Sequence, residues 1–405
     1  MAGRAVAEPP GGLWRWDDFV LDAARYELRR ADTVIKVEPQ VFDVLMQLVT
    51  HHDRVLTKEE LLDSVWGSRF VGEAALTSRI KAARRALGDD GASQRYIRTV
   101  RGRGYQFVGQ LRELSDEADP EPEPPMPSQH VAFCRAEDGV RLAYAVTGKG
   151  APLVRAANWM THLGYDIESP VWSHWVRDLS AHHTFVRYDE RGCGLSDWHA
   201  QDFTFDDWVT DLESVVEAVG LERFALLGVS QGGAVAVAYT ARHPDRVSRL
   251  VLNGAYAQGR AVRALSDDEK RAAALDLELA RVGWGRSDPA FRRVFAAQFL
   301  PDGTRADWEA FDQLQQRTTS AQNAVRFLEV FAGIDVRDLA RHVRCPTLVL
   351  HSRDDHRVPL RYAEELASLI PEARLVALPS NNHLLTSGEP AWRTFCDEVE
   401  LFLGI

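Results

Sequence analysis

An acidic, proline-rich segment divides the chain into two parts that are expected to fold separately. Residues 113–129 hold five prolines and six Asp or Glu residues, and they offer almost no side chain that a core could bury. Proline stiffens a chain and like charges repel, so this composition is typical of an extended, solvated linker. The 405 residues therefore predict two domains, 13–112 and 130–405, joined by this linker.

Charge is distributed unevenly between the two parts. Residues 1–112 contain 18 Lys or Arg and 15 Asp or Glu, a net charge of +3, whereas residues 113–405 contain 30 against 44, a net charge of −14. The basic excess is strongest in residues 76–112, with nine basic and two acidic side chains. Such an excess is typical of surfaces that bind polyanions. We therefore expect the first domain, and not the second, to bind nucleic acid.

Cysteine usage and hydropathy indicate the cellular compartment. Cys134, Cys193, Cys345 and Cys396 show no Cys-x-x-Cys pairing and no nearby histidine at a metal-ligand spacing. Free thiols in a reducing compartment, with no metal and no cofactor, are the expectation. The N-terminal residues lack a signal-peptide pattern, and the longest weakly charged run, 224–241, is interrupted by three glycines. We expect a cytoplasmic protein without a membrane span.

The first domain shows the pattern of three helices followed by a hairpin. Apolar residues at helical spacing predict helices that open at Pro39 and after Thr57, and a third over about residues 73–87. The last strands flank the basic sequence RGRG (101–104). This order of elements predicts a winged helix-turn-helix, an α+β fold. Short strands are expected at residues 26–30, 33–37, 96–100 and 105–108.

The third helix and the hairpin carry the side chains that we expect to contact DNA. Leu76 and Ile80 lie on the apolar stripe of the helix, so its opposite arc faces outward. Arg and Lys can donate to guanine edges or phosphates, and a glycine-hinged hairpin can follow the backbone or the minor groove. The alternative is a basic face that is merely solvated. The candidates are Ser78, Arg79, Lys81, Arg84 (towards a phosphate) and Arg85 in the helix, and Arg98, Arg101 and Arg103 in the hairpin.

Residues 13–109 resemble the effector domain of OmpR/PhoB-type regulators. The resemblance is carried by TKEELL (57–62), RRALG (84–88) and above all IRTVRGRGY (97–105). It implies a domain that binds double-stranded DNA. Regulators with this domain commonly engage paired half-sites, so a homodimer, or a dimer assembled on DNA, is expected.

The second domain alternates strands with helices, which predicts a mostly parallel sheet flanked by helices. Residues 255–342 hold no convincing strand but many helix formers and aromatic side chains, so we expect a helical lid over the carboxyl edge of the sheet. The strands are expected at residues 131–135, 141–146, 153–157, 185–188, 224–227, 250–253, 347–350 and 375–377.

A Gly-x-Ser-x-Gly pentapeptide, residues 228–232, lies between an expected strand and an expected helix. A side chain at either glycine would crowd the strand and the helix where the chain turns sharply between them. This turn exposes the hydroxyl of Ser230 at its apex, as a nucleophile requires.

Residues 130–405 resemble the α/β-hydrolase superfamily. The resemblance rests on the Gly-x-Ser-x-Gly turn, on YDERGCGLS (188–196) and on His383. One departure is ANW (157–159), which stands where many members have His-Gly after the first core strand. That pattern is similar to a subgroup of hydrolase-like domains that are fused to regulatory or cyclase modules.

A serine nucleophile needs a base and an acid, and in this fold they follow the serine in the order acid, then histidine. Only His356 and His383 follow the candidate acids, and His356 stands directly next to them. His383 is therefore the expected base for Ser230. Asp354 and Asp355 both suit the acid by position. The resemblance favours Asp355, because the acid commonly stands four residues before the proline of a Val-Pro pair.

Stabilisation of an acyl intermediate requires hydrogen-bond donors aimed at its oxyanion. We expect the backbone N–H of Gln231 and that of Trp159, in the loop after the first core strand, to provide them. Asn158, Trp159 and His162 are the expected ligand-pocket residues, although any single aromatic is at least as often a core residue.

Two functions are in view for the combined chain. The first is a ligand-responsive transcription regulator, whose hydrolase-like domain senses, and can hydrolyse, a small apolar ester, lactone or amide. The alternative is an active serine esterase-type enzyme with an accessory DNA-binding module. An interaction scaffold with an inert pocket is less favoured, because the Ser, Asp and His occur in the required order.

Overall fold

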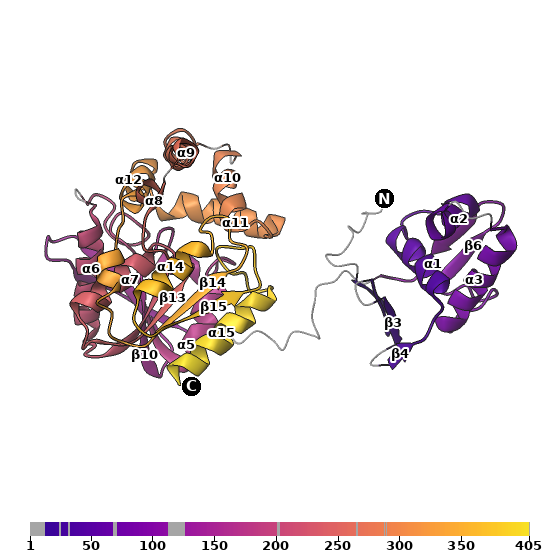
Figure 1. Ribbon diagram of the computed structural model, residues 1–405, viewed down its shortest axis with the longest axis horizontal. Coiled ribbons are helices and arrows are strands. Elements are labelled where there is room, and N and C mark those ends of the chain that lie inside the picture. The colour runs from indigo at the N-terminus through magenta and orange to yellow at the C-terminus, as the bar shows by residue number, and fades with distance from the viewer. Residues whose placement is uncertain are drawn as a thin grey trace. The chain divides into compact units, whose positions relative to one another are not determined.

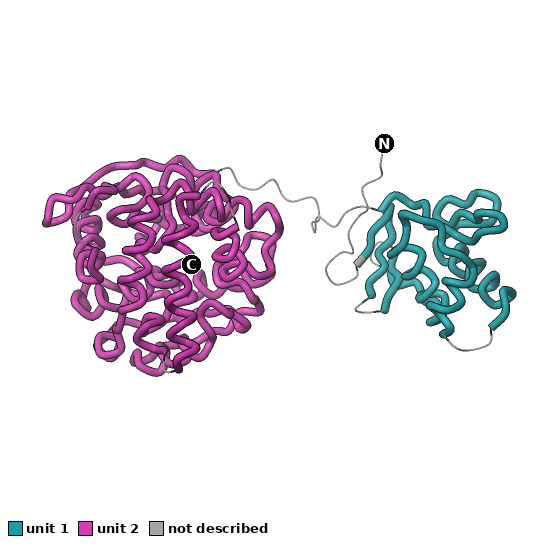
Figure 2. Tube along the Cα trace, turned by 90° about the horizontal axis from the view of Figure 1, so that it is seen from above, with its two compact units in different colours: residues 1–123 teal, residues 124–405 magenta. Residues whose placement is uncertain are grey.

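The computed structural model describes residues 13–404, apart from 24–25, 31–32, 68–70, 112–125, 201–202, 265, 287 and 289. Most of the acidic, proline-rich segment at 113–129 lies outside these residues. The chain divides into two compact units, Met1–Glu123 and Pro124–Ile405, which Figure 2 colours separately.

The first unit opens with a four-stranded antiparallel sheet in which each strand pairs with the next. Sequence patterns predicted its last two strands and missed its first two. Alternate side chains of β2 are buried, so the sheet turns one face to the core. The strands are β1 (Leu13–Trp16), β2 (Phe19–Asp22), β3 (Glu27–Arg30) and β4 (Thr33–Ile35).

Three helices and a second, three-stranded sheet complete this unit as a winged helix-turn-helix fold. The predicted capping box is present, since Glu60 N–H donates to Thr57 Oγ1 (3.1 Å) and Thr57 N–H donates to Glu60 Oε2 (2.7 Å). The strand order is β5-β7-β6, so the hairpin is anchored beside the start of α2. The elements are α1 (Pro39–Thr50), β5 (Leu56–Thr57), α2 (Lys58–Trp66), α3 (Glu73–Ala86), β6 (Ile97–Val100) and β7 (Gly104–Phe107).

An eight-stranded sheet forms the centre of the second unit, in the order β15-β14-β13-β12-β10-β11-β9-β8. The strands from β15 to β11 are parallel, while β9 and β8 add an antiparallel edge. All six residues of β12 are buried, as expected of a central parallel strand. The strands are β8 (Gln129–Arg135), β9 (Arg141–Thr147), β10 (Ala151–Ala156), β11 (His183–Tyr188), β12 (Phe224–Val229), β13 (Val247–Asn253), β14 (Thr347–Ser352) and β15 (Ala373–Leu378).

Helices connect and flank these strands. The helices α5 and α15 are joined by contact between the rings of Trp175 and Phe395, whereas α6 and α7 pack against one another. The described helices of the sheet domain are α4 (Leu163–Asp166), α5 (Ser173–His182), α6 (Phe205–Val219), α7 (Gly232–Arg242), α13 (Arg337–Ala340), α14 (Arg361–Leu369) and α15 (Pro390–Leu403).

The lid is a single insertion between β13 and β14, and its helices α8 to α12 gather at one end of the unit (Figure 1). The chain enters and leaves it side by side: Gly259 N–H donates to Ile334 O (2.8 Å) and Val336 N–H to Ala257 O (2.9 Å). The lid helices are α8 (Arg260–Arg263), α9 (Asp267–Gly283), α10 (Ala290–Phe299), α11 (Arg305–Thr318) and α12 (Ala321–Ala332).

Aromatic packing joins the lid to the sheet domain. Trp208 of α6 stacks on Phe327 of α12, with ring centroids 5.7 Å apart and planes inclined by 15°. The Thr319 hydroxyl donates to Gly192 O at 2.6 Å, which fixes the lid to the turn after β11. The lid therefore shares the core of the sheet domain.

Candidate functional site

Ser230 occupies a sharp turn between β12 and α7, and its backbone has φ of +52°. Few residues other than glycine adopt this region, so the position is strained. A Cβ atom on Gly228 would lie 2.6 Å from Gly233 Cα, and one on Gly232 would lie 2.7 Å from Ala157 O. Glycine at 228 therefore lets β12 and α7 approach this closely, and glycine at 232 makes room for the loop after β10.

The structure brings Ser230, His383 and Asp355 together in one hydrogen-bonded chain. His383 Nε2 lies 2.9 Å from Ser230 Oγ, and His383 Nδ1 lies 2.6 Å from Asp355 Oδ2. His383 and Asp355 are buried, whereas Ser230 is partly exposed. The arrangement is that of a serine nucleophile, a base and an orienting carboxylate.

Burial and hydrogen bonding act in opposite directions on the carboxyl of Asp355. Burial raises its pKa, but the His383 imidazole and the backbone N–H of Val358 outweigh burial, so that the pKa is lowered. The carboxylate is therefore ionised at neutral pH and can hold Nδ1 of His383 in its protonated form. The other candidate acid, Asp354, is exposed, and the structure places no contact between it and the imidazole.

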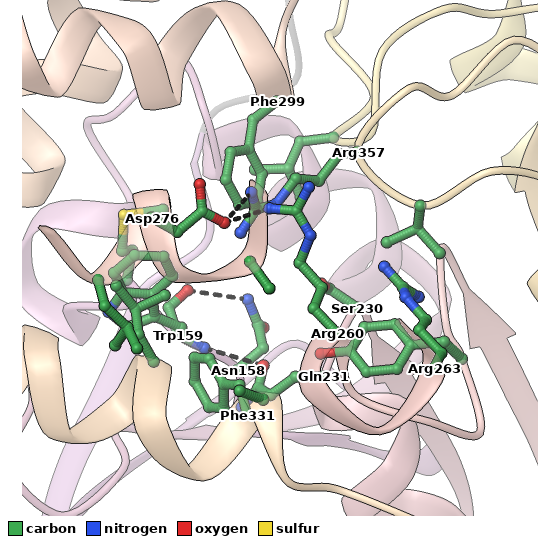
Figure 3. A pocket seen from close by; sticks show the side chains of 18 residues that line it. Asn158, Trp159, Ser230, Gln231, Arg260, Arg263, Asp276, Phe299, Phe331 and Arg357 are labelled. Carbon is green, nitrogen blue, oxygen red and sulfur yellow. Dashed lines mark hydrogen bonds and ion pairs between the residues drawn. The ribbon is translucent and has the colours of Figure 1, made fainter. Parts of the chain in front are cut away.

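The two expected oxyanion donors lie beside the serine, but one of them already has an acceptor. The backbone N–H of Trp159 donates to Gln231 Oε1 at 3.2 Å, and the Gln231 amide donates in turn to Glu190 Oε1 at 2.5 Å. Figure 3 shows the first of these bonds at the floor of the pocket. The Trp159 N–H is therefore already bonded to a side-chain oxygen that lies in the same pocket.

Glu190 lies beneath this site in a fully buried position. Burial raises the pKa of its carboxyl to about 8, with Asp211 and Asp189 adding to the effect and the Gln231 amide opposing it. The group is therefore protonated at neutral pH. Its Oε2 atom has no hydrogen-bond partner among the described residues.

A cavity opens beside Ser230 under the lid (Figure 3). Asn158 and Trp159 line it as predicted, and lid residues supply much of the remaining apolar wall. His162 has a different place, since its Nδ1 accepts a hydrogen bond from Tyr165 N–H (3.2 Å) at the start of α4 and it does not line this cavity. The lining aromatic and aliphatic side chains include Trp159, Leu277, Phe299, Leu328 and Phe331.

Sequence reasoning missed a set of charged residues in the same wall: Arg260, Arg263, Arg357 and Asp276. Three of them come from lid helices that carry no recognisable motif. Arg357, however, follows Asp355 by two residues in the loop after β14, so its nearness to the acid could have placed it at the site.

On the first unit, the predicted DNA-contacting residues fall into two groups. Ser78, Lys81 and Arg85 are exposed on α3, and Arg98, Arg101 and Arg103 are exposed on the hairpin. Two further arginines of α3 are engaged within the domain.

Arg84 binds the hairpin through two of its nitrogen atoms: Nε and Nη2 donate to Ile97 O at 3.2 and 2.7 Å. Nη2 also donates to Thr99 Oγ1 at 2.9 Å. Arg79 donates to Gln40 Oε1 at 3.1 Å and forms an ion pair with Glu38. These bonds hold the helix against α1 and the hairpin, which leaves Lys81 and Arg85 as the more available cations of α3.

Two classes of site are not found within the described part of the chain. No group of three or more His, Cys, Asp or Glu side chains is placed to hold a metal ion there. None of the helices between residues 13 and 404 that the structure describes is long and apolar enough to cross a membrane.

Family models match both units. The model described as "alpha/beta hydrolase fold" matches residues 163–390, which is more than half of the chain. The model described as "Transcriptional regulatory protein, C terminal" matches residues 32–107.

Known proteins similar to the second unit include several that are named as hydrolases. The chain is 30% identical over 225 residues to a 2-hydroxy-6-oxo-2,4-heptadienoate hydrolase of Pseudomonas putida. This alignment covers 50% of this chain and 74% of that protein. It is 28% identical over 271 residues to a non-heme haloperoxidase of Rhodococcus erythropolis, spanning 62% and 92%.

Solved structures give the same result. A hydrolase from Pseudomonas aeruginosa PA01 superposes with a TM-score of 0.56 at 25% identity, over 68% of this chain and 99% of that one. The esterase RhEst1 from a Rhodococcus species superposes with a TM-score of 0.54 at 26% identity, over 68% and 98%.

Proposed function

Because the chain belongs to the alpha/beta hydrolase fold family and also carries a transcriptional-regulator DNA-binding domain, we propose that it is a ligand-responsive transcription regulator. Its hydrolase domain recognises a small ester, lactone or amide with an apolar portion. Occupation of the pocket changes the affinity of the first unit for DNA.

The observation that carries this proposal is the hydrogen-bonded chain from Asp355 to Ser230, which opens into a cavity under the lid. A regulator that kept the hydrolase fold only as a scaffold would not need Ser230, His383 and Asp355 within hydrogen-bonding distance of one another. Their presence supports recognition of a compound with an acyl carbon that a serine oxygen can approach.

The geometry supports a two-step acyl transfer. Ser230 Oγ attacks the carbonyl carbon while His383 Nε2 accepts the hydroxyl proton, and the backbone N–H groups of Gln231 and Trp159 receive the negative oxygen. The protonated His383 gives its proton to the leaving alcohol or amine. Water then attacks the acyl-serine with the same base, which releases the acid and restores Ser230.

The lining of the cavity supports an apolar portion in the ligand. Trp159 stacks on Trp284 of the lid with centroids 5.3 Å apart, and Phe331 and Phe299 approach it edge-on. These rings bury apolar surface of a bound compound, and several of them belong to helices of the lid. Ligand binding would therefore favour one position of the lid over others.

A working esterase with an accessory DNA-binding module is the second candidate. It is favoured by one observation: the Ser230, His383 and Asp355 hydrogen bonds are complete as the molecule stands. In that case, the first unit would bring a catalyst to DNA without responding to the substrate.

Substitution of Ser230 separates the two candidates. The wild-type chain, Ser230→Ala and His383→Ala are compared for hydrolysis of p-nitrophenyl butyrate and for binding to duplex DNA from the promoter of the chain's own gene. A regulator predicts that ester binding still shifts DNA affinity in Ser230→Ala, although turnover is lost. If an ester demonstrably occupies the pocket and DNA affinity stays unchanged, regulation by ligand is refuted and the enzyme is favoured.

We further propose that two copies bind paired half-sites on double-stranded DNA. Support comes from the exposed cations of α3 and the hairpin, which suit major-groove contacts and backbone contacts respectively. Sedimentation of the chain with and without a two-site duplex tests the stoichiometry, and a one-to-one complex would contradict it.

A further inference from the structure

One side of the cavity beside Ser230 is formed by cations. Arg260 and Arg263 of α8 and Arg357 of the loop after β14 line it, and Asp276 of α9 supplies the single carboxylate among the described lining residues. Figure 3 shows Asp276 turned towards two of the guanidinium groups, with Arg263 set apart from them. The wall therefore carries an excess of two positive charges.

Two of the three arginines share the one carboxylate. Arg357 Nη1 lies 2.7 Å from Asp276 Oδ2, and Arg260 forms an ion pair with the same oxygen atom. Arg357 Nη1 also donates to Gln298 Oε1 at 2.6 Å. These two side chains are thus held in place, and their summed charge is only half neutralised.

Arg263 has no such partner. Its Nη1 atom is buried and has no hydrogen-bond partner among the described residues. Its guanidinium lies instead over the rings of Tyr362, at 4.1 Å from the centroid, and Tyr256, at 5.3 Å. Ring faces hold a cation but leave its in-plane N–H donors unused, and a buried donor without an acceptor is costly.

The same three arginines also border a neighbouring hollow. Arg361, His356 and Tyr362 line this second space, and Glu269 is the one carboxylate among its described lining residues. Positive charge therefore continues from the cavity of Ser230 into the adjoining space, and an anionic group between the two would meet guanidinium groups from more than one direction.

We propose that the ligand of the hydrolase domain is an acid, with a carboxylate or phosphate group that accepts hydrogen bonds from Arg263. This inference rests on the proposed function and names its class of compound: an acyl carbon at Ser230, an apolar middle between the lid aromatics and an oxyanion at the arginines. A guanidinium matches such an oxyanion through two parallel N–H donors. An uncharged compound would leave the excess charge of the wall uncompensated.

The test compares two esters of equal acyl length, monoethyl adipate and ethyl hexanoate, which differ in a terminal carboxylate. We expect kcat/KM to be at least tenfold higher for monoethyl adipate with the wild-type chain. In Arg263→Gln, this preference should fall about tenfold or more. The matched control is Arg293→Gln, an exposed arginine of α10 that does not line the cavity, and it should keep the preference.

Other results are equally decisive. If ethyl hexanoate is the better substrate, the charge assignment is overturned while the hydrolytic role stands. If the preference survives in Arg263→Gln, the oxyanion does not bind at Arg263. If neither ester is hydrolysed, calorimetry with Ser230→Ala compares how tightly each ester binds. Tighter binding of monoethyl adipate supports the inference, and no binding of either ester overturns it. The DNA-affinity experiment still tests the regulator in that case. Competition by adipate and by monobutyl phosphate distinguishes a carboxylate from a phosphate.

Discussion

Both oxygen atoms of the Asp355 carboxylate are engaged, and His383 is held by only one of them. Oδ2 lies 2.6 Å from His383 Nδ1, while Oδ1 accepts the backbone N–H groups of Arg357 (2.8 Å) and Val358 (2.9 Å). The loop after β14 thus fixes the carboxylate through its own main chain. The orientation of the imidazole depends on this loop and also on the lid, because Phe299 of α10 accepts the backbone N–H of His383 (2.9 Å) and its ring lies against the imidazole.

We expect Asp355→Asn to lower kcat for ester hydrolysis by about 10³- to 10⁴-fold, because an amide cannot stabilise the imidazolium that forms on His383. The stopped assay is p-nitrophenyl butyrate hydrolysis at neutral pH. Asp354→Asn is the matched control, since this neighbouring carboxylate is exposed, and it should retain nearly full activity. The reverse order of the two effects would assign the acid to Asp354.

We expect Glu190→Gln to stabilise the fold in neutral and alkaline solution. The carboxyl has an ordinary pKa of 4.5 and a folded-state pKa of about 8, so the folded protein retains a proton that the unfolded chain releases between these values. Stability contributed by this group therefore falls as pH rises through that window.

The free energy of unfolding, measured with urea from pH 5 to pH 9, checks this expectation. The variant should exceed the wild type by on the order of a few kcal/mol at pH 9, and the gap should shrink towards pH 5. A constant gap across this range would show that Glu190 is already ionised in the folded protein.

We expect Lys81→Ala and Arg85→Ala to weaken binding to non-specific duplex DNA. Each lost phosphate contact should reduce the slope of log K against log salt by about 0.9. Fluorescence anisotropy at several salt concentrations gives this slope. Arg84→Ala should act differently: its bonds to Ile97 O anchor the hairpin, so its main effect should be a lower melting temperature of the first unit. An unchanged slope for both Lys81→Ala and Arg85→Ala would remove α3 from the DNA interface.

We expect Arg191→Met to destabilise the second unit by about 3–5 kcal/mol, because it leaves the carboxylate of Asp211 buried without a cation. Arg191 donates to both oxygens of Asp211, at 2.8 and 2.7 Å, and both side chains are buried. Urea unfolding measures the loss. Arg305→Met, which removes a fully exposed partner of Glu309, should change the midpoint little and serves as the control. Equal effects would mean that burial of the first pair is unimportant.

Periodicity carried most of the fold prediction. The eight strands of the second unit and the three helices of the first were predicted from apolar spacing, and the structure confirms them within a few residues. The first two strands of the chain were missed because their turn lacks the usual signal. The turn between β1 and β2 places Asp17, rather than glycine or asparagine, at φ of +44°.

The charged wall of the cavity lay beyond sequence reasoning for a related reason. Arg260 and Arg263 stand on a four-residue helix of the lid, and Asp276 stands on the next helix. Neither segment has a motif, and their common position depends on how the lid packs. By contrast, the spacing around Ser230 is set by local backbone geometry, which is why the pentapeptide was sufficient to locate it.

The two strands of chain that enter and leave the lid lie side by side, so the sheet domain does not depend on the length of the lid between them. Gln258 and Asp335 form a bridge where the insertion leaves and rejoins the sheet domain, so β13 and β14 remain adjacent whatever lies between them. Closing a longer or shorter loop across this bridge changes the free energy only slowly with length. The lid can therefore change in length without separating β13 from β14, provided that the segment around Phe299, whose carbonyl oxygen accepts the backbone N–H of His383, is kept.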